Sequence, residues 1–448
     1  MRLQTRKILD RAFSGSGVLA IALMASALVI LLVPMFVRGA GAIFFTGTVE
    51  HRRVMLEKFE RGDRPAVEAE IAAAQEARAP VYRMLADFDR RLDEGDAAYR
   101  ARYAKPVKEL KKALRELFGP APGSIRPMLM RDQYGQTRWD RARVKRERVI
   151  YREEWDYSNP AKAGIRLLKP RVLDFAGTPV EGLFGDLEHN LEKMLLPRKT
   201  AYWQFLTDES YDSHFFGGIW PELLGTFYLT VGALLLAIPM GLIAAIYLTE
   251  YAVESRLLQV LRTCISTLSG VPSIVFGLFG LAFFINTLHV SRSKSVLAGS
   301  MTLALMILPT VIRASEEAIR AVPRTYKEAA MSLGAGRWHT VLSIILPAAL
   351  PGILTGIVIS MGRAAGETAP IIFTAAVSVG KPLAFWQTWT QPTPALSWNI
   401  YNLATEHEAV DEVRHVQYGL VLVLVVLVLL LNLAAILLRA RIARRMRT

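Results

Sequence analysis

Two pairs of opposite charges lie at the ends of strongly apolar stretches. Arg313 is followed three residues later by Glu316, and Arg363 is followed four residues later by Glu367. Both spacings place the two side chains on one face of a helix. A charge at membrane depth is costly unless it is paired or faces a cavity. Because an arginine fork donates two parallel hydrogen bonds to an oxyanion, both pairs are candidates for the lining of an anion permeation path.

The competing interpretation places both arginines at the membrane interface. A long basic side chain can extend to the head groups while its stem stays in the apolar layer, and the nearby carboxylate is then only a local counter-charge. For Arg313, which precedes a polar segment, both interpretations remain open. Arg363 and Glu367 have apolar sequence on both sides, which favours the permeation path.

A polar segment between two apolar stretches carries a second pattern. Pro323 can begin a helix, and Lys327 to Leu333 contains two helix-favouring alanines. Gly334 and Gly336 then permit a tight turn before the next apolar helix begins near Trp338. We expect two short helices at an angle that present a carboxylate on an exposed face. Such a shape suits docking into a cleft of another protein.

This segment, residues 321–347, resembles the coupling motif of ABC importer permeases, which is E-A-A, three residues, G, nine residues and I-x-L-P. The resemblance implies that a pair of cytoplasmic ATPase subunits contacts and moves the segment during transport. An ordinary linker with a solvated carboxylate is the alternative, and the completeness of the motif argues against it. Every motif position is filled, by Glu328, Ala329, Ala330, Gly334, Ile344, Leu346 and Pro347.

The chain contains no phosphate-binding loop of the G-x4-G-K-[ST] type. Its one Gly-Lys pair, Gly380 and Lys381, is followed by Pro382. ATP hydrolysis is therefore expected on a partner subunit. The sequence predicts a transport subunit and not an enzyme, with no catalytic residue, metal site or cofactor.

The elements that must position these residues are membrane spans. Of the 448 residues, 52% are hydrophobic, and crossing a bilayer takes about 20 apolar residues per helix. The first apolar run is too long for the core of a signal peptide, so residues 17–38 are expected to be an uncleaved anchor after a short amino-terminal segment, 1–16. Six stretches qualify: Gly17 to Val37, Leu223 to Leu248, Leu261 to Leu288, Val296 to Ile312, Val341 to Gly362 and Tyr418 to Leu438.

Cys264 is the single cysteine, which excludes an intrachain disulfide. Because it lies inside the expected third span, it is predicted to be a small buried apolar side chain.

Basic residues flanking the spans predict the orientation. They cluster at the amino terminus, at the turn with Arg256 and Arg262, between Arg313 and Arg337, and from Arg439 onward. Six spans place all four clusters in the cytoplasm, so both termini are expected there in a multi-pass protein of a bacterial inner membrane. The net charge of +14 lies largely at the ends of apolar runs, which favours a lipid bilayer and not a nucleic acid as the partner.

A polar insert, residues 39–216, separates the first two spans and is expected outside the cytoplasm. Ranges 66–76, 81–94 and 105–117 have apolar residues at helical spacing, whereas Arg143 to Tyr157 alternates charged with branched or aromatic residues, as strands do. We therefore expect a small mixed α/β domain with its helices first. Its basic cluster, Arg141 to Arg148, suits an anion or a nucleic acid, but a solvated strand face is favoured because acidic residues follow at once. No function is predicted for the insert.

Residues 217–448 resemble the PstA-type permeases of bacterial phosphate importers. Three stretches carry the resemblance: G-G-I-W-P-E-L-L-G-T-F-Y-L-T, L-S-G-V-P-S-I-V-F-G-L-F-G and G-E-T-A-P-I-I-F-T-A. It implies the all-α, polytopic fold of a type I ABC importer permease with six transmembrane helices, into which the mixed domain is inserted. It also implies inorganic phosphate as cargo, with a second permease of PstC type, two ATPases of PstB type and a soluble phosphate-binding protein as partners. Charged residues at the positions of Arg313 and Glu316 are associated with transport in that family.

Two other functions remain open. An importer of this kind can carry another oxyanion or a small polar solute, because the motifs constrain the cargo less firmly than the mechanism. A membrane-anchored sensor or adhesion protein that acts through its insert is a different class of function. The complete coupling motif argues against that class.

Overall fold

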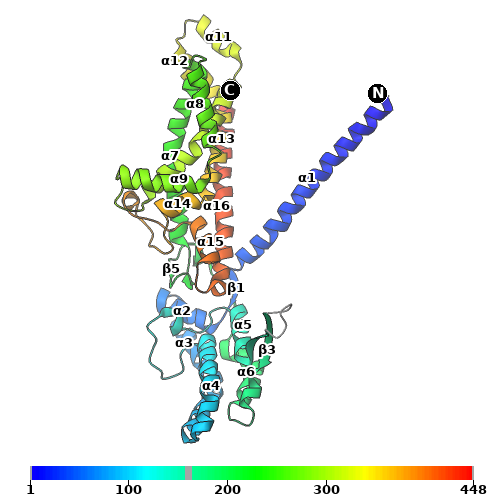
Figure 1. Cartoon of the computed structure of the whole chain (residues 1–448), viewed down its shortest axis with the longest axis vertical. Helices are drawn as coiled ribbons and strands as arrows, with labels where there is room; N and C mark the ends of the chain where they lie inside the picture. Colours follow the sequence, from blue (N-terminus) through cyan, green and yellow to red (C-terminus); the bar gives the residue numbers. More distant parts are fainter. Residues whose placement is uncertain (1–2, 157–163, 446–448) are drawn as a thin grey trace. The chain divides into compact units, whose positions relative to one another are not determined.

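The computed structural model describes residues 3–156 and 164–445, which form two units (Figure 1). The helical unit contains Met1–Ala42 and Trp203–Thr448, and the insert unit contains Ile43–Tyr202. Expectations that concern residues 1–2, Tyr157 or residues 446–448 lie outside the described residues.

The insert unit is shorter than the range 39–216 because residues 203–219 bond within the helical unit. The short helix η4 (Trp203–Leu206) places the ring of Phe205 against Gly419. The carbonyl oxygen of Phe205 also accepts a hydrogen bond of 2.9 Å from the backbone nitrogen of Ile219. An antiparallel hairpin whose strands have two residues each, β5 (Ser210–Tyr211) and β6 (Phe216–Gly217), completes this connection.

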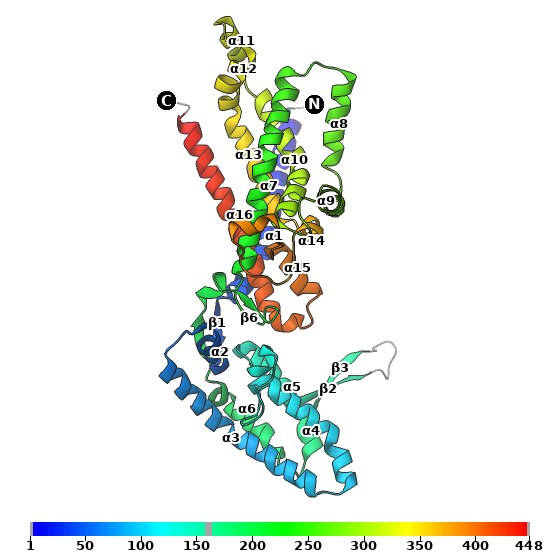
Figure 2. The ribbon, with the colours of Figure 1, turned by 90° about the vertical axis from the view of Figure 1, so that its left-hand side faces the viewer.

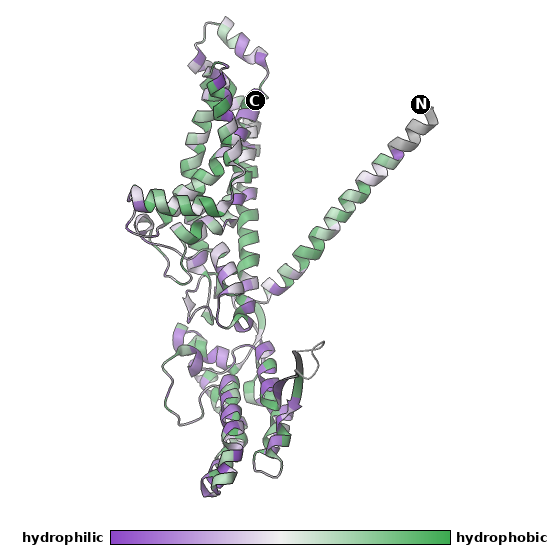
Figure 3. Ribbon diagram, in the orientation of Figure 1, coloured by the Kyte–Doolittle hydropathy of each residue, from purple (hydrophilic) through white to green (hydrophobic). Residues whose placement is uncertain are grey.

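Long apolar helices make up the helical unit, which confirms the expected all-α, polytopic architecture. Within the described residues, five helices are long and apolar enough to cross a membrane, or six if one bent pair counts as a single span. Figure 3 shows this apolar character along most of the first helix, whereas the helices of the insert unit carry many hydrophilic residues. The long helices are α1 (Leu3–Ala40), α7 (Trp220–Ile246), α10 (Val296–Arg320), α13 (Leu346–Gly366) and α16 (Val410–Arg445).

The expected third span, Leu261 to Leu288, is a bent pair of helices in the structure. Helix α8 (Arg256–Leu268) and helix α9 (Ser273–Gly280), which a π-helical segment extends to Thr287, meet at an angle of 101°. The break contains Pro272, whose ring disfavours the α conformation for the preceding residue and which has no backbone N–H to donate. Cys264 on α8 is exposed and not buried as expected. Only Leu258 of α8 is buried, so this helix packs on one face at one end.

Helices α7, α10 and α13 pack side by side through small residues (Figure 2). A Cβ atom on Gly352 would lie 2.7 Å from the Cβ of Ala318, and one on Gly356 only 2.2 Å from the Cβ of Ala314. The ridge of small residues on α13 therefore serves close approach to α10 within this subunit. By contrast, no residue in the most apolar stretch of α1 is buried. Short elements connect α13 to α16: α14 (Ala369–Thr374), η8 (Phe385–Trp389) and α15 (Leu396–Thr405).

The insert unit is mainly helical, with two small antiparallel strand pairs. Strand β1 (Phe44–Gly47) pairs with β4 (Arg198–Ala201), and β2 (Tyr151–Asp156) pairs with β3 (Ile165–Pro170). A core of leucine, valine and phenylalanine side chains fills the space between the helices. The helices are α2 (Val49–Phe59), α3 (Arg64–Glu94), α4 (Ala97–Phe118), α5 (Trp139–Ile150) and α6 (Glu181–Leu195), with short turns η1 (Met130–Gln133) and η3 (Arg171–Phe175).

Two expectations for the insert are corrected. The ranges 66–76 and 81–94 form one helix, α3, which continues through Pro80. Residues 139–150, expected in part as a strand, form α5. The buried residues of α5 are Ala142, Lys145 and Val149, which have helical spacing. The packing of this face, and not the alternation of charges, therefore determines the structure of this segment.

Candidate functional site

The segment 321–347 begins with helix α11 (Arg324–Ser332), whose end is built around Gly334. Gly334 has φ +86°, the left-handed conformation that glycine adopts without steric cost. The backbone nitrogen of Gly334 donates to Met331, and that of Ala335 donates to Ala330, which is the Schellman pattern of helix termination. The spacing from Ala330 to Gly334 in the motif is therefore the spacing that this end of the helix requires.

The second half of the segment leads directly into the next long helix. Helix α12 (Arg337–Thr340) is followed by a π-helical turn, η7 (Val341–Ile345), and then by α13. Pro347 has no backbone N–H, and the turn before it is widened so that Leu346 donates to Val341, five residues earlier. The I-x-L-P part of the motif thus forms a continuous but locally widened entry to α13.

An ion pair attaches α11 to the end of α7. Lys327 Nζ lies 2.5 Å from Glu250 Oε2, and the Glu250 side chain is only 13% exposed. Glu250 belongs to the π-helical turn η5 (Tyr247–Tyr251) that extends α7. An apolar cluster contributed by α7, α10, η7 and α13 surrounds this junction: Ala245, Ile246, Ile319, Val341, Ile345, Ala349 and Ile353.

The outer surface of the segment is exposed and partly apolar. Glu328 and Ala329 are exposed, as the motif predicts, whereas Ala330 is buried against the rest of the unit. Five large apolar side chains of the segment are exposed, and the most exposed of them are Leu333, at 90%, and Trp338, at 60%. Several exposed apolar side chains within one short polar segment suit a contact with another protein. Matching to the motif did not indicate Leu333 and Trp338, although both lie within two residues of a turn glycine in the sequence.

Arg363 and Glu367 come together as their spacing suggests. Arg363 Nε lies 3.3 Å from Glu367 Oε1, and both side chains are partly buried. The backbone oxygen of Glu367 accepts a hydrogen bond from Ser397 at the start of α15, which fixes the end of α13. Arg363 and Glu367 thus form an ion pair at the junction of α13, α14 and α15.

Arg313 and Glu316 do not form an ion pair with each other. Glu316 Oε1 faces Arg262 Nε of helix α8 at 4.0 Å. Arg262 also donates to the Leu248 carbonyl oxygen and to Glu254, so it connects α8 to the end of α7. Arg313 is exposed and has no ion-pair partner within the described part of the chain. Sequence reasoning missed Arg262, because its partner lies 54 positions away on another helix.

Arg313 and Arg363 lie at different positions along the length of the helical bundle. Gly356 of α13 packs against Ala314 of α10, the neighbour of Arg313. Arg363 is seven residues further along α13, which corresponds to about 10 Å of helix rise. One unpaired arginine and one arginine paired to a carboxylate are therefore spaced along the length of the bundle. Such an arrangement suits sequential contact with an anion.

Comparison with known proteins gives a consistent result. Residues 237–448 match the family described as "Binding-protein-dependent transport system inner membrane component". A probable ABC transporter permease of Bacillus subtilis, YqgI, is 36% identical over 242 residues, which are 52% of this chain and 81% of the relative. The phosphate transport system permease PstA 1 of Mycobacterium tuberculosis is 35% identical, covering 56% of this chain and 78% of the relative. The corresponding PstA of Yersinia pestis is 37% identical, covering 49% and 71%.

Proposed function

Because this chain belongs to the family of binding-protein-dependent ABC importer permeases, among its PstA-type members, we propose that it carries inorganic phosphate into the cytoplasm. It is a multi-pass membrane protein and a transport subunit, not an enzyme. The observation that carries the mechanism is the complete coupling motif folded into the exposed segment 321–347. The relatives named as phosphate permeases support the cargo.

The proposed assembly places ATP hydrolysis on partner chains. Permeases of this family work with ATPase subunits and a binding protein. For this chain the specific partners are a second permease of PstC type, two ATPases of PstB type and a soluble phosphate-binding protein. Exposed Leu333 and Trp338 beside Glu328 support docking of an ATPase at this segment. A large aromatic side chain such as that of Trp338 is typical of the centre of a protein interface, and charged side chains such as that of Glu328 are typical of its rim.

The proposed orientation puts both termini and the segment 321–347 in the cytoplasm of a bacterial cell. The basic clusters that flank the spans support it. The insert unit then lies on the outer side of the inner membrane.

The proposed permeation path uses Arg363 and Arg313 in turn. Glu367 neutralises Arg363 in the absence of cargo, and an arriving phosphate replaces the carboxylate as the partner of the guanidinium. Arg313 is available to the anion because Glu316 faces Arg262 instead. A sulfate or another oxyanion would meet the same groups, so uptake measurements must compare the two cargoes.

Reversing the charge of Arg363 tests this path. In a strain that lacks the native subunit, the variant Arg363→Glu is expected to lower labelled phosphate uptake at least about tenfold, which corresponds to about 1.4 kcal/mol. The physical reason is that two adjacent carboxylates repel the anion. Arg292→Glu makes the same charge change at an exposed position of an interhelical loop and should leave uptake unchanged. Unchanged phosphate uptake by inserted Arg363→Glu would make Arg363 a structural residue, and a selective loss of sulfate uptake would reassign the cargo.

Removing the insert unit tests whether the helical unit transports by itself. The backbone nitrogen of Tyr202 donates to the oxygen of Ile43 at 2.8 Å, so a short glycine-serine linker can replace Ile43–Tyr202 without separating the cut ends. This deletion is expected to retain phosphate uptake in the same strain. A longer deletion, residues 43–210, also removes Phe205 from its contact with Gly419 and should abolish insertion. Loss of uptake by the shorter deletion, with normal insertion, would show that the insert takes part in transport.

A further inference from the structure

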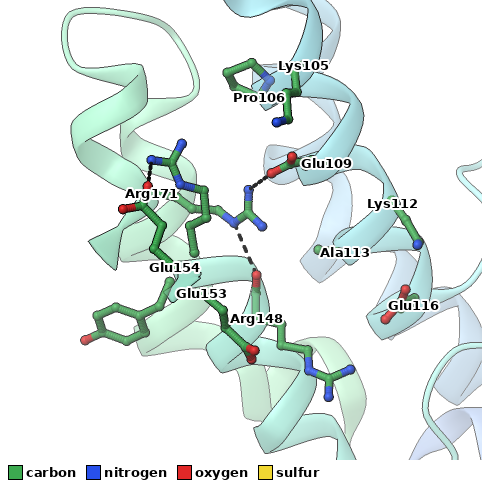
Figure 4. A pocket seen from close by; sticks show the side chains of 12 residues that line it. Lys105, Pro106, Glu109, Lys112, Ala113, Glu116, Arg148, Glu153, Glu154 and Arg171 are labelled. Atoms are coloured by element: carbon green, nitrogen blue, oxygen red, sulfur yellow. Dashed lines mark hydrogen bonds and ion pairs between the residues drawn. The ribbon is translucent and has the colours of Figure 1, made fainter. Parts of the chain in front are cut away.

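A cavity of about 670 Å³ lies within the insert unit, between α4 and the chain that runs from the end of α5 into β2 (Figure 4). Its size is that of a small-molecule site, but its walls are mostly charged. One wall is a stripe of α4 at helical spacing: Lys105, Glu109, Lys112 and Glu116. The opposite wall contains Arg148, Arg152 and Glu154, with Arg171 from η3.

The two helices that border the cavity are strongly basic. Helix α4 has seven basic and two acidic residues, and α5 has five basic and two acidic residues. The cluster Arg141 to Arg148 thus belongs to a helix and not to a solvated strand face. Part of this charge reaches the cavity through Arg148. The lining itself has five basic and four acidic residues, so the excess of positive charge that favours an anion comes mainly from the surrounding helices.

Three of the carboxylates that line the cavity are already neutralised by basic residues. Glu109 Oε2 lies 3.1 Å from Arg171 Nη1, and Glu116 Oε2 lies 2.7 Å from Lys145 Nζ. Glu154 forms ion pairs with Lys169 and Arg152, and the hydrogen bond from Lys169, followed by that from Arg152, lowers the pKa of its carboxyl. The fourth, Glu153, also has an interaction partner. These carboxylates are not available as sites for a cation.

Three basic side chains of the lining remain without a carboxylate. Lys105, Lys112 and Arg148 are exposed and form no ion pair within residues 3–156 and 164–445. The buried Nε of Arg152 in the same wall also lacks an acceptor. Lys105 and Lys112 are seven residues apart on α4, a separation of about 10 Å, and Arg148 contributes from the other wall. One small oxyanion cannot contact all of them at once.

We propose that this cavity binds a small anion that carries at least two phosphate groups. Phosphate groups match the donors, because lysine binds them as a point charge and arginine binds them with two parallel hydrogen bonds. Two such groups can accept hydrogen bonds from donors on both walls at once, and the carboxylates Glu109, Glu116 and Glu154 repel them less because each is already paired with a basic residue. The proposal is independent of the import function, since it concerns the insert unit alone.

Binding of pyrophosphate to the full-length protein in a neutral detergent tests the proposal. Isothermal titration calorimetry at low ionic strength is expected to show saturable binding at one site. Lys112→Gln and Arg148→Gln should each raise the dissociation constant at least about fivefold, and the double variant at least about tenfold. All the altered side chains are exposed, so a thermal unfolding curve should remain that of the unmodified protein.

Lys108→Gln is the matched control. Lys108 is an exposed basic residue on α4 that does not line the cavity, so its removal changes the net charge equally without touching the site. The control should bind pyrophosphate with an unchanged dissociation constant. An equal loss in Lys108→Gln and Lys112→Gln, or the absence of saturable binding, would overturn the proposal. Orthophosphate that binds as tightly as pyrophosphate would also overturn it.

A second ligand distinguishes a free solute from a lipid head group as the source of phosphate. Glycerophosphoglycerol, the deacylated head group of an anionic phospholipid, carries a single phosphodiester. A free solute is indicated if this compound fails to compete with pyrophosphate at tenfold excess. Competition that depends on Lys112 and Arg148 would overturn the requirement for two phosphate groups and would assign the cavity to the single phosphate of a lipid head group.

Discussion

Replacing Gly334 by valine is expected to reduce phosphate uptake at least about tenfold while the protein still inserts into the membrane. Gly334 has φ +86°, and a non-glycine residue in this conformation costs about 1–2 kcal/mol. No heavy atom lies within 4 Å of a Cβ at this position, so the effect comes from the backbone and not from a clash. The turn opens, and α11 loses its fixed angle to α12. Labelled phosphate uptake, normalised to the amount of subunit in the membrane, measures the effect.

Two variants serve as controls for this prediction. Gly336 has φ −70° and also has no neighbour within 4 Å, so Gly336→Val should transport normally. Gly334→Asn should retain most of the uptake, because asparagine tolerates the left-handed conformation. Normal uptake by Gly334→Val would remove the basis for assigning coupling to this segment. An equal loss in Gly336→Val would show that bulk, not backbone conformation, is what the segment cannot accept.

Exchanging the charges of Glu250 and Lys327 is expected to restore transport that either reversal alone impairs. Each single variant, Glu250→Lys or Lys327→Glu, places two like charges at a junction where one side chain is nearly buried. Ion pairs of this kind couple by about 1 kcal/mol, a factor of about five. Each reversal should therefore reduce phosphate transported per ATP hydrolysed by at least that factor in vesicles reconstituted with the partner subunits. The double variant should recover most of the ratio.

Glu254→Lys provides the comparison for the charge exchange. Glu254 pairs with Arg262 at a side chain that is 72% exposed, and such pairs contribute little. Its reversal should leave the ratio of transport to hydrolysis unchanged. If the single variants at Glu250 and Lys327 also transport normally, the ion pair is only a surface contact. If the double variant is as impaired as the singles, the two residues act separately.

The backbone structure of segment 321–347 was well predicted from local sequence patterns because local interactions determine it. The positions of Ala330 and Gly334 follow from the hydrogen bonds that end one helix, and Pro347 follows from the turn that begins another. The contacts of Glu250 with Lys327 and of Arg262 with Glu316 join residues 77 and 54 positions apart. Only tertiary packing brings such residues together, so no spacing rule indicates them.

The bend between α8 and α9 and the helical structure of α5 show a second limit of prediction from the sequence. Hydropathy is continuous through Pro272, and an average over many residues conceals a break that one residue causes. In α5 the alternation of charges suggested a strand, whereas three buried positions at helical spacing determine the structure.

The close packing of α10 against α13 has a mechanical consequence. The segment 321–347 joins these two helices, and Gly352 and Gly356 let their backbones approach so closely that a Cβ atom would collide with Ala318 or Ala314. We therefore expect a displacement of the segment to move both helices, and with them Arg313 and Arg363.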